Sequence, residues 1–124
     1  MSRAQPLVFI TGASSGIGQA LAARYLSEGW RVALLARREA AMVQWVSEQG
    51  VSADRVRVYG ADVRDDAQVL QAAQRCLAEM GVPDVVVANA GISVGVDLSL
   101  AEDLPVLRDL YQTNVLAMAA TFQP

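Results

Sequence analysis

The chain reads LVFITGASSGIG from Leu7 to Gly18, an apolar run that ends in a glycine-rich turn and opens into a helical pattern. Glycine lets the backbone turn tightly and approach a ligand closely, and the first N–H groups of a helix have no intrahelical acceptors. Such amides bind anions, phosphate among them. The order of strand, turn and helix therefore predicts a nucleotide phosphate site.

The rest of the chain switches repeatedly between two hydrophobic periods. Short β-branched or aliphatic runs predict strands at 7–10, 32–36, 56–59 and 85–88. The first, second and fourth runs lack polar alternation, as expected for strands that are covered on both faces. Helical patterns predict helices at 17–27, at 39–49, from Asp65 or Asp66 to a stop at Gly81, and at 105–122.

Strict alternation of strands and helices predicts parallel strands joined by right-handed crossovers. With a glycine-rich turn after the first strand, this indicates an α/β, doubly wound (Rossmann) parallel sheet with helices on both faces and strand order 3-2-1-4. Ligands of such sheets bind at the carboxyl ends of the strands, here between the first and the fourth. We expect one incomplete domain over residues 1–124, truncated after the fourth strand and the helix that follows it.

Composition narrows the possible partners and chemistry. The net charge is −3 without a basic cluster, so nucleic acid and anionic membranes are poor candidates. No apolar run approaches the roughly 20 residues of a membrane-spanning helix, and a cytoplasmic location is expected. All ten basic residues are arginines, so lysine and histidine are absent as proton carriers. The single cysteine, Cys76, offers no metal-ligand spacing and is predicted to be a small buried packing residue.

Four motifs in register resemble those of the short-chain dehydrogenases/reductases. Residues 11–18, TGASSGIG, resemble the family's Thr-Gly-x3-Gly-x-Gly motif, and Asp62-Val63 resembles its Asp-hydrophobic pair beside the adenine. Asn89-Ala90-Gly91 is similar to the Asn-Asn-Ala-Gly motif, with Ala88 in place of the first asparagine. Asn114 aligns with the family's helix asparagine. The resemblance covers essentially the whole chain but only the N-terminal half of a typical member.

The resemblance implies a nicotinamide dinucleotide as cofactor. Gly12 would shape the turn, Gly16 would allow close approach of the pyrophosphate, and Gly18 would permit tight helix–strand packing. Ile17 lies within the same motif. Ser14 and Ser15 either donate hydrogen bonds to ribose or phosphate or merely cap the helix.

Arg37 and Arg38 follow the second strand, where the adenine ribose is expected. A carboxylate at this point favours NAD, whereas a guanidinium forms a fork of hydrogen bonds to the 2′-phosphate of NADP. Because Ala36 precedes two arginines, we expect NADP, with NAD as the alternative cofactor; surface arginines without a ligand role are the structural alternative.

The remaining site residues each have a structural alternative. Asp62 would accept a hydrogen bond from the adenine amino group, with the Val63 backbone beside it, or would be a loop aspartate that caps the next helix. Asp65 and Asp66 are nearer candidates for that cap, which leaves the Asp62 carboxylate available. Asn89, Ala90 and Gly91 would border the ribose or nicotinamide, or simply form a turn. Asn114, as the candidate catalytic residue, would hold a water of the family's proton relay, or bond a neighbouring backbone group.

The expected function is that of an NADP-dependent oxidoreductase that moves a hydride between nicotinamide and a small carbonyl or alcohol substrate. The family's catalytic Ser and Tyr-x3-Lys follow a fifth strand, and this chain stops at Pro124 before it. The 124 residues alone are therefore expected to be inactive; a non-catalytic dinucleotide-binding module or an inactive fragment is the alternative. Members commonly form dimers or tetramers, so a homo-oligomer is expected. Without a fifth strand, 85–87 would form an apolar edge, and poor solubility or a bound partner is expected.

Overall fold

The computed structural model describes residues 5–13, 16–89, 104–105, 108, 112 and 121–122. The elements in these residues are β1 (Leu7–Thr11), α1 (Gly16–Ser27), β2 (Arg31–Ala36), α2 (Glu39–Glu48), β3 (Val56–Gly60), α3 (Asp66–Glu79) and β4 (Val85–Val87). They confirm the predicted strands and the first three predicted helices, with ends shifted by one or two residues. The predicted helix at 105–122 lies mostly outside the described residues.

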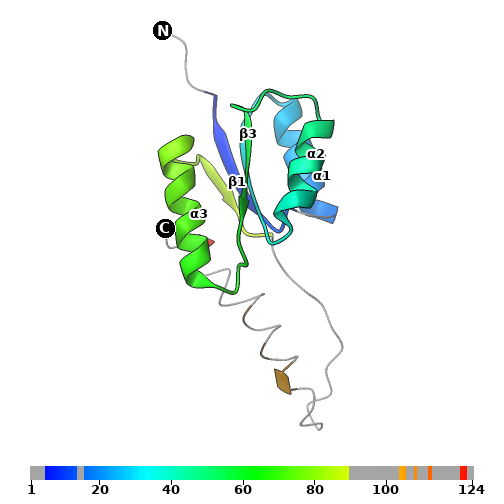
Figure 1. Ribbon diagram of the computed structural model, residues 1–124. Helices are drawn as coiled ribbons and strands as arrows, with labels where there is room; N and C mark the ends of the chain where they lie inside the picture. The colour runs from blue at the N-terminus through cyan, green and yellow to red at the C-terminus, as the bar shows by residue number, and fades with distance from the viewer. Residues whose placement is uncertain are drawn as a thin grey trace.

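The four strands form one parallel sheet with the order β3-β2-β1-β4, which confirms the predicted topology. Figure 1 shows α1 and α2 together on one face of this sheet and α3 on the other. β1 is the central strand at which the order reverses, because it pairs with β2 on one side and β4 on the other. All five residues of β1 are buried. The expected absence of polar alternation in β1 therefore reflects burial on both faces.

Alternate residues of β1 supply the two halves of the core. Val8 and Ile10 belong to the cluster that contains Met42 of α2 and Ala22 and Leu26 of α1. Leu7 and Phe9 belong to the cluster on the α3 side, which contains Cys76. Successive side chains of a strand point to opposite faces, so one central strand anchors both helical layers.

Side chains near the amino ends of the strands form hydrogen bonds to a neighbouring strand and to the ends of two helices. Asp84 Oδ2 accepts a hydrogen bond of 2.8 Å from the Leu7 N–H, and the Asp84 N–H donates to the Leu7 carbonyl at 2.8 Å. Arg31 Nη1 donates to the Met80 carbonyl at the end of α3, at 2.7 Å. Arg55 Nη2 donates to the Leu26 carbonyl in the last turn of α1, at 2.8 Å. The two arginines thus donate to carbonyls at the carboxyl ends of α3 and α1, where a helix leaves carbonyl groups unpaired or partly paired.

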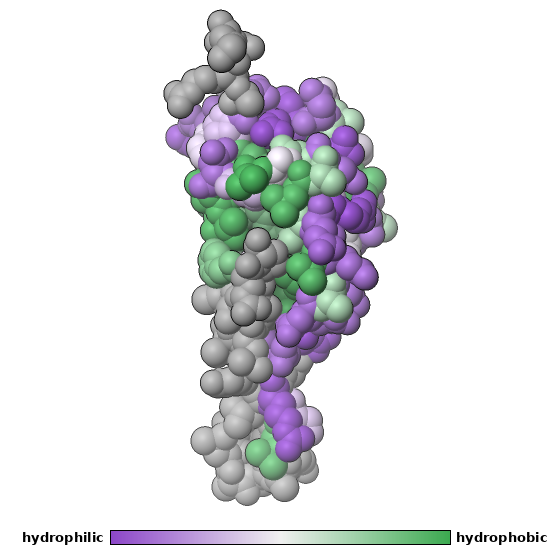
Figure 2. Space-filling model, turned by 90° about the vertical axis from the view of Figure 1, so that its left-hand side faces the viewer, coloured by the Kyte–Doolittle hydropathy of each residue, from purple (hydrophilic) through white to green (hydrophobic). Residues whose placement is uncertain are grey.

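The face beside α3 and β4 is apolar. Figure 2, viewed from that side, shows hydrophobic residues gathered between hydrophilic areas. The side chains of Leu77, Val82 and Phe122 are exposed, and they line a hollow of about 200 Å³ together with Pro83 and Val86. β4 is only half-buried and is the last strand of the sheet on this side among the described residues. Within the described part of the chain, no helix has the length and apolar character needed to cross a membrane.

The bond between Asp84 and Leu7 leads to a stability prediction. Asp84→Ala removes the acceptor of an N–H on a fully buried residue, so we expect the free energy of unfolding to fall by about 1–3 kcal/mol. Asp84→Asn retains an oxygen acceptor and should lose less than half as much. Urea denaturation of the full chain measures both values. Equal losses in the two variants would contradict the assigned hydrogen bond.

Candidate functional site

The glycine-rich turn joins β1 to α1 and has a backbone that side chains disfavour. Gly12 has φ 64° and Gly16 has φ 54°, both in the left-handed region that glycine adopts without strain. A Cβ built on Gly16 would meet no atom within 4 Å. The turn therefore leaves open space beside the start of α1, where the unpaired N–H groups of a helix are found.

Gly18 lies two residues further along α1 and is packed against the end of β1. A Cβ at this position would overlap the Gly12 carbonyl oxygen and come within 2.8 Å of the Ala13 Cα. It would also lie 3.0 Å from Asn89 Nδ2. Only a residue without a side chain lets α1 approach the end of β1 this closely.

Asn89, just beyond β4, holds the same turn from the other side. Its side-chain Nδ2 donates to the Gly12 carbonyl at 3.2 Å, and its backbone N–H donates to Thr11 Oγ1 at 3.0 Å. β1 and β4 are neighbours in the sheet, so their carboxyl ends meet here. The structure thus brings together the glycine motif and the first residue of the Asn89-Ala90-Gly91 motif.

The ends of β2 and β3 form the adjoining part of this edge. Arg37 and Arg38 follow β2 and are exposed, and Arg38 occupies the N-cap position of α2 without a side-chain capping bond. Ala61 continues from β3 and donates its N–H to the Ala36 carbonyl at 3.2 Å. The Glu39 side chain lies over Gly60, where an added Cβ would be 3.0 Å from Glu39 Cδ. Glu39 is a carboxylate at the candidate ribose position that the sequence analysis did not single out.

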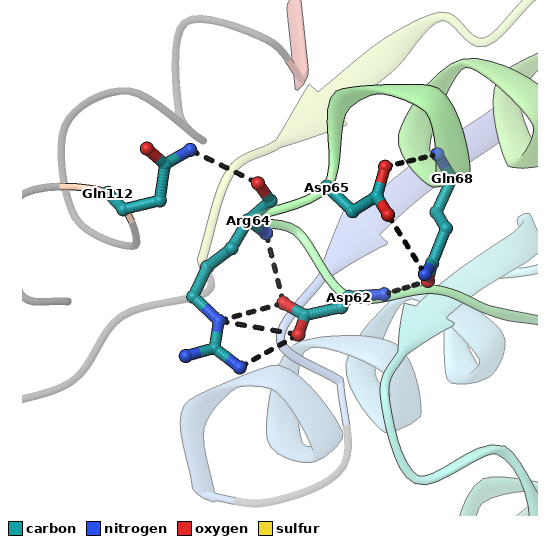
Figure 3. A network of polar contacts seen from close by, with 5 residues as sticks. All are labelled: Asp62, Arg64, Asp65, Gln68 and Gln112. Atoms are coloured by element: carbon teal, nitrogen blue, oxygen red, sulfur yellow. Dashed lines mark hydrogen bonds and ion pairs between the residues drawn. The ribbon is translucent and has the colours of Figure 1, made fainter.

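Asp62 lies at this edge as predicted, but its carboxylate is not available in the way the sequence suggested. Figure 3 shows Asp62 bound by Arg64: Oδ1 accepts from the Arg64 backbone N–H at 3.0 Å and from Nε at 3.1 Å, and Oδ2 accepts from Nη2 at 2.8 Å. Asp65 does cap α3, accepting from the N–H groups of Ala67 and Gln68 at 3.0 and 3.2 Å. The expectation that this cap leaves Asp62 without a partner is wrong, because an arginine two residues along takes the carboxylate.

This bonding fixes the charge of the Asp62 carboxyl. Hydrogen bonds from Arg64 lower its pKa below the ordinary aspartate value, and the nearby charge of Arg37 acts in the same direction. A hydrogen bond and a positive charge both favour the ionised form. Arg37, which follows β2, and Arg64, which follows β3, therefore both favour the ionised Asp62 carboxyl.

The other predicted site residues divide into two groups. Ile17, in the first turn of α1, is 69% exposed at the mouth of the glycine turn, and Val63 follows Asp62 in a half-buried loop. The remaining candidates lie outside the described residues; they are Ser14, Ser15, Ala90, Gly91 and Asn114.

Tyr25 and Tyr59, the two tyrosines among the described residues, and Cys76 pack against neighbouring side chains of the core. The hydroxyl of buried Tyr59 donates to Glu79 Oε2 at 2.7 Å, and burial raises its pKa, which is opposite to what proton transfer near neutral pH needs. The Tyr25 ring makes an edge-on contact with Trp30, with the ring centroids 4.9 Å apart. Burial raises the pKa of the Cys76 thiol to about 11, in keeping with the predicted packing role.

Comparison with known proteins gives the family. The model of the short chain dehydrogenase family matches residues 6–123. A curated relative, 3-dehydrosphinganine reductase TSC10B of Arabidopsis thaliana, is 41% identical over 92 residues, which are 73% of this chain and 27% of that protein. D-threitol dehydrogenase of Mycolicibacterium smegmatis is 33% identical over 116 residues, covering 94% of this chain and 43% of the relative.

Solved structures agree with this result. A short-chain dehydrogenase from Streptomyces avermitilis superposes with a TM-score of 0.84 at 34% identity, covering 97% of this chain and 43% of that one. A 3-ketoacyl-(acyl-carrier-protein) reductase from Brucella melitensis, complexed with NADH, superposes at 0.81 with 27% identity, over 94% of this chain and 46% of that one. The chain spans less than half the length of each of these four relatives. With the family model matched over nearly every residue, the chain belongs to the short-chain dehydrogenase family.

Proposed function

We propose that this chain forms the NADP-binding half of an oxidoreductase that acts on a small carbonyl or alcohol substrate. The observation that carries the proposal is the glycine turn, which Gly18 and Asn89 hold in shape beside open space at the start of α1. Its backbone fits a diphosphate, because N–H groups at a helix start bind anions. A bound nicotinamide would supply the hydride donor or acceptor.

The chain's own residues would bind and orient that cofactor. Amides of the Gly12–Gly18 turn would hold the diphosphate, Ser14 and Ser15 would add hydroxyl donors, and the exposed Ile17 side chain would pack against the ligand. Asp62 and Val63 would border the adenine. Asn89, Ala90 and Gly91 would border the nicotinamide ribose, and Asn114 would belong to the proton relay.

The catalytic Ser and Tyr-x3-Lys of the family have no counterpart in these 124 residues, so we propose that these residues bind cofactor without turning over substrate. A cytoplasmic homo-oligomer remains our expectation for the parent protein. The alternative is a non-catalytic dinucleotide-binding module. NADPH oxidation with a panel of carbonyl compounds, compared between this chain and one extended through those residues, separates the two.

Two observations bear on the choice between NADP and NAD. Arg37 and Arg38 are exposed beside β2 and supply two guanidinium groups for a 2′-phosphate. The Glu39 carboxylate over Gly60 is the observation that favours NAD, because a carboxylate can accept from a ribose 2′-hydroxyl and repels a phosphate. We favour NADP because Arg37 and Arg38 outnumber Glu39, while the Asp62 carboxylate is already paired with Arg64.

Gly18 tests the phosphate site. In Gly18→Ala the new Cβ overlaps the Gly12 carbonyl, so we expect the turn to shift and NADPH affinity to fall about tenfold or more, a loss of at least ~1.4 kcal/mol. Gly29→Ala is the matched control: it forces alanine into φ 84° at the far end of α1 and strains the chain without touching the turn. Calorimetric titration of both variants should show weakened binding only for Gly18→Ala. Unchanged affinity in Gly18→Ala would remove the basis of the proposed site.

Arg37 and Arg38 test the cofactor preference. We expect Arg37→Met and Arg38→Met each to weaken NADPH binding about tenfold, since a hydrogen bond to a charged group contributes roughly 1.5–3 kcal/mol. NADH affinity should change by less than about threefold, because NADH has no 2′-phosphate. Titrations with both dinucleotides at one salt concentration measure this. Tighter binding of NADH than NADPH by the unmodified chain would overturn NADP and establish the alternative.

A further inference from the structure

The Asp62 carboxylate is almost fully used by one neighbouring residue. A carboxylate offers about four lone-pair positions, and Arg64 supplies three donors to them: its backbone N–H, Nε and Nη2. In Figure 3 the guanidinium lies along the carboxylate so that two of its nitrogens face the two oxygens. Bidentate pairs of this kind are stronger than hydrogen bonds between neutral groups. A neutral amino group on a ligand therefore competes poorly with Arg64 for the Asp62 carboxylate oxygens.

The loop that carries this pair is fixed by bonds on both sides. The Asp62 N–H donates to Gln68 Oε1 at 2.8 Å, and Gln68 Nε2 donates to Asp65 Oδ2 at 3.2 Å. The Arg64 carbonyl accepts from Gln112 Nε2 at 3.1 Å. These contacts hold the backbone of residues 62–65, so Arg64 is positioned against Asp62 by its surroundings (Figure 3).

The pair is nevertheless open to a ligand. The side chains of Asp62 and Arg64 are 26% and 35% exposed, and both line an open hollow of about 550 Å³ with Gln68 and Gln112. A planar base at this edge would meet the ion pair as a unit, with the guanidinium donors beside the carboxylate acceptors.

We propose that Arg64 is a positioning residue that removes selectivity for the 6-amino group of adenine at the dinucleotide site. This inference rests on the proposed function. A lone carboxylate attracts a 6-amino donor and repels a 6-oxo acceptor. A carboxylate bound by two nitrogens of an arginine guanidinium does neither strongly, because most of its lone-pair positions are occupied and its charge is balanced. The site should therefore accept adenine and hypoxanthine dinucleotides alike.

The test compares dissociation constants for NADPH and its deamino analogue, in which hypoxanthine replaces adenine. We expect the unmodified chain to bind the two within about threefold, and Arg64→Met to prefer NADPH about tenfold or more, as expected for one hydrogen bond to a charged group. The control is Arg24→Met, which removes the same charge from a side chain 77% exposed in the last turn of α1 and should keep the unmodified ratio.

A second background shows whether Arg64 acts through Asp62. The double variant Asp62→Ala with Arg64→Met should lose the tenfold preference for NADPH that Arg64→Met alone shows, since no carboxylate remains to accept from the 6-amino group. Arg64→Lys retains a charged donor and should give a ratio nearer to that of the unmodified chain than Arg64→Met does.

Each other outcome counts against one proposal. Binding of both dinucleotides with a tenfold preference for NADPH in the unmodified chain, or an unchanged ratio in Arg64→Met, overturns the role of Arg64 alone. Binding of neither by the folded, unmodified chain overturns the proposed function, and this inference with it.

Discussion

The candidate site depends on one steric constraint: α1 can lie against the end of β1 only because residue 18 has no side chain. The closest neighbours of the missing Cβ are backbone atoms of Gly12 and Ala13, which cannot move aside as a flexible side chain could. Asn89 adds a hydrogen bond to the same Gly12 carbonyl from beyond β4. Gly18, from the start of α1, and Asn89, from a distant part of the chain, thereby both contact the same Gly12 carbonyl. A site whose contacts are formed before its ligand arrives loses less entropy on binding.

Arginine supplies every cation of this chain, and its task differs between the two edges of the sheet. At the amino edge, Arg31 and Arg55 donate to carbonyls near the ends of α3 and α1, so their charge serves the fold. At the carboxyl edge, Arg37 and Arg38 are exposed beside β2, and Arg64 holds a carboxylate. Arg37 and Arg38 therefore place exposed positive charge at the carboxyl edge of the sheet. The net charge of the chain is nevertheless negative.

Much of the fold could be predicted because it depends on patterns local to each element. The apolar runs located all four strands, and their alternation with helices gave the sheet order, since crossover handedness leaves few topologies. The Asp65 cap of α3 could also be predicted, because a capping side chain bonds only the residues that directly follow it.

Partner choice among side chains at the site was harder to predict. Asn89 and Gly12 are 77 positions apart, so their bond depends on the register of β1 and β4. Arg64 is only two residues from Asp62, a spacing at which an aspartate commonly bonds the backbone, and this was the signal available for the pair. Glu39 at the start of α2 lies over Gly60 at the end of β3, and nothing in its local sequence indicates that contact.

Cys76, the single cysteine of the chain, allows the opening of α3 to be followed by chemical labelling. Cys76 is 1% exposed on the inner side of that helix, and its raised pKa keeps it protonated at neutral pH. Alkylating reagents attack the thiolate, so both access and ionisation require the helix to leave the sheet. The rate at which the native protein is labelled would therefore follow the opening of the layer that α3 forms against the sheet.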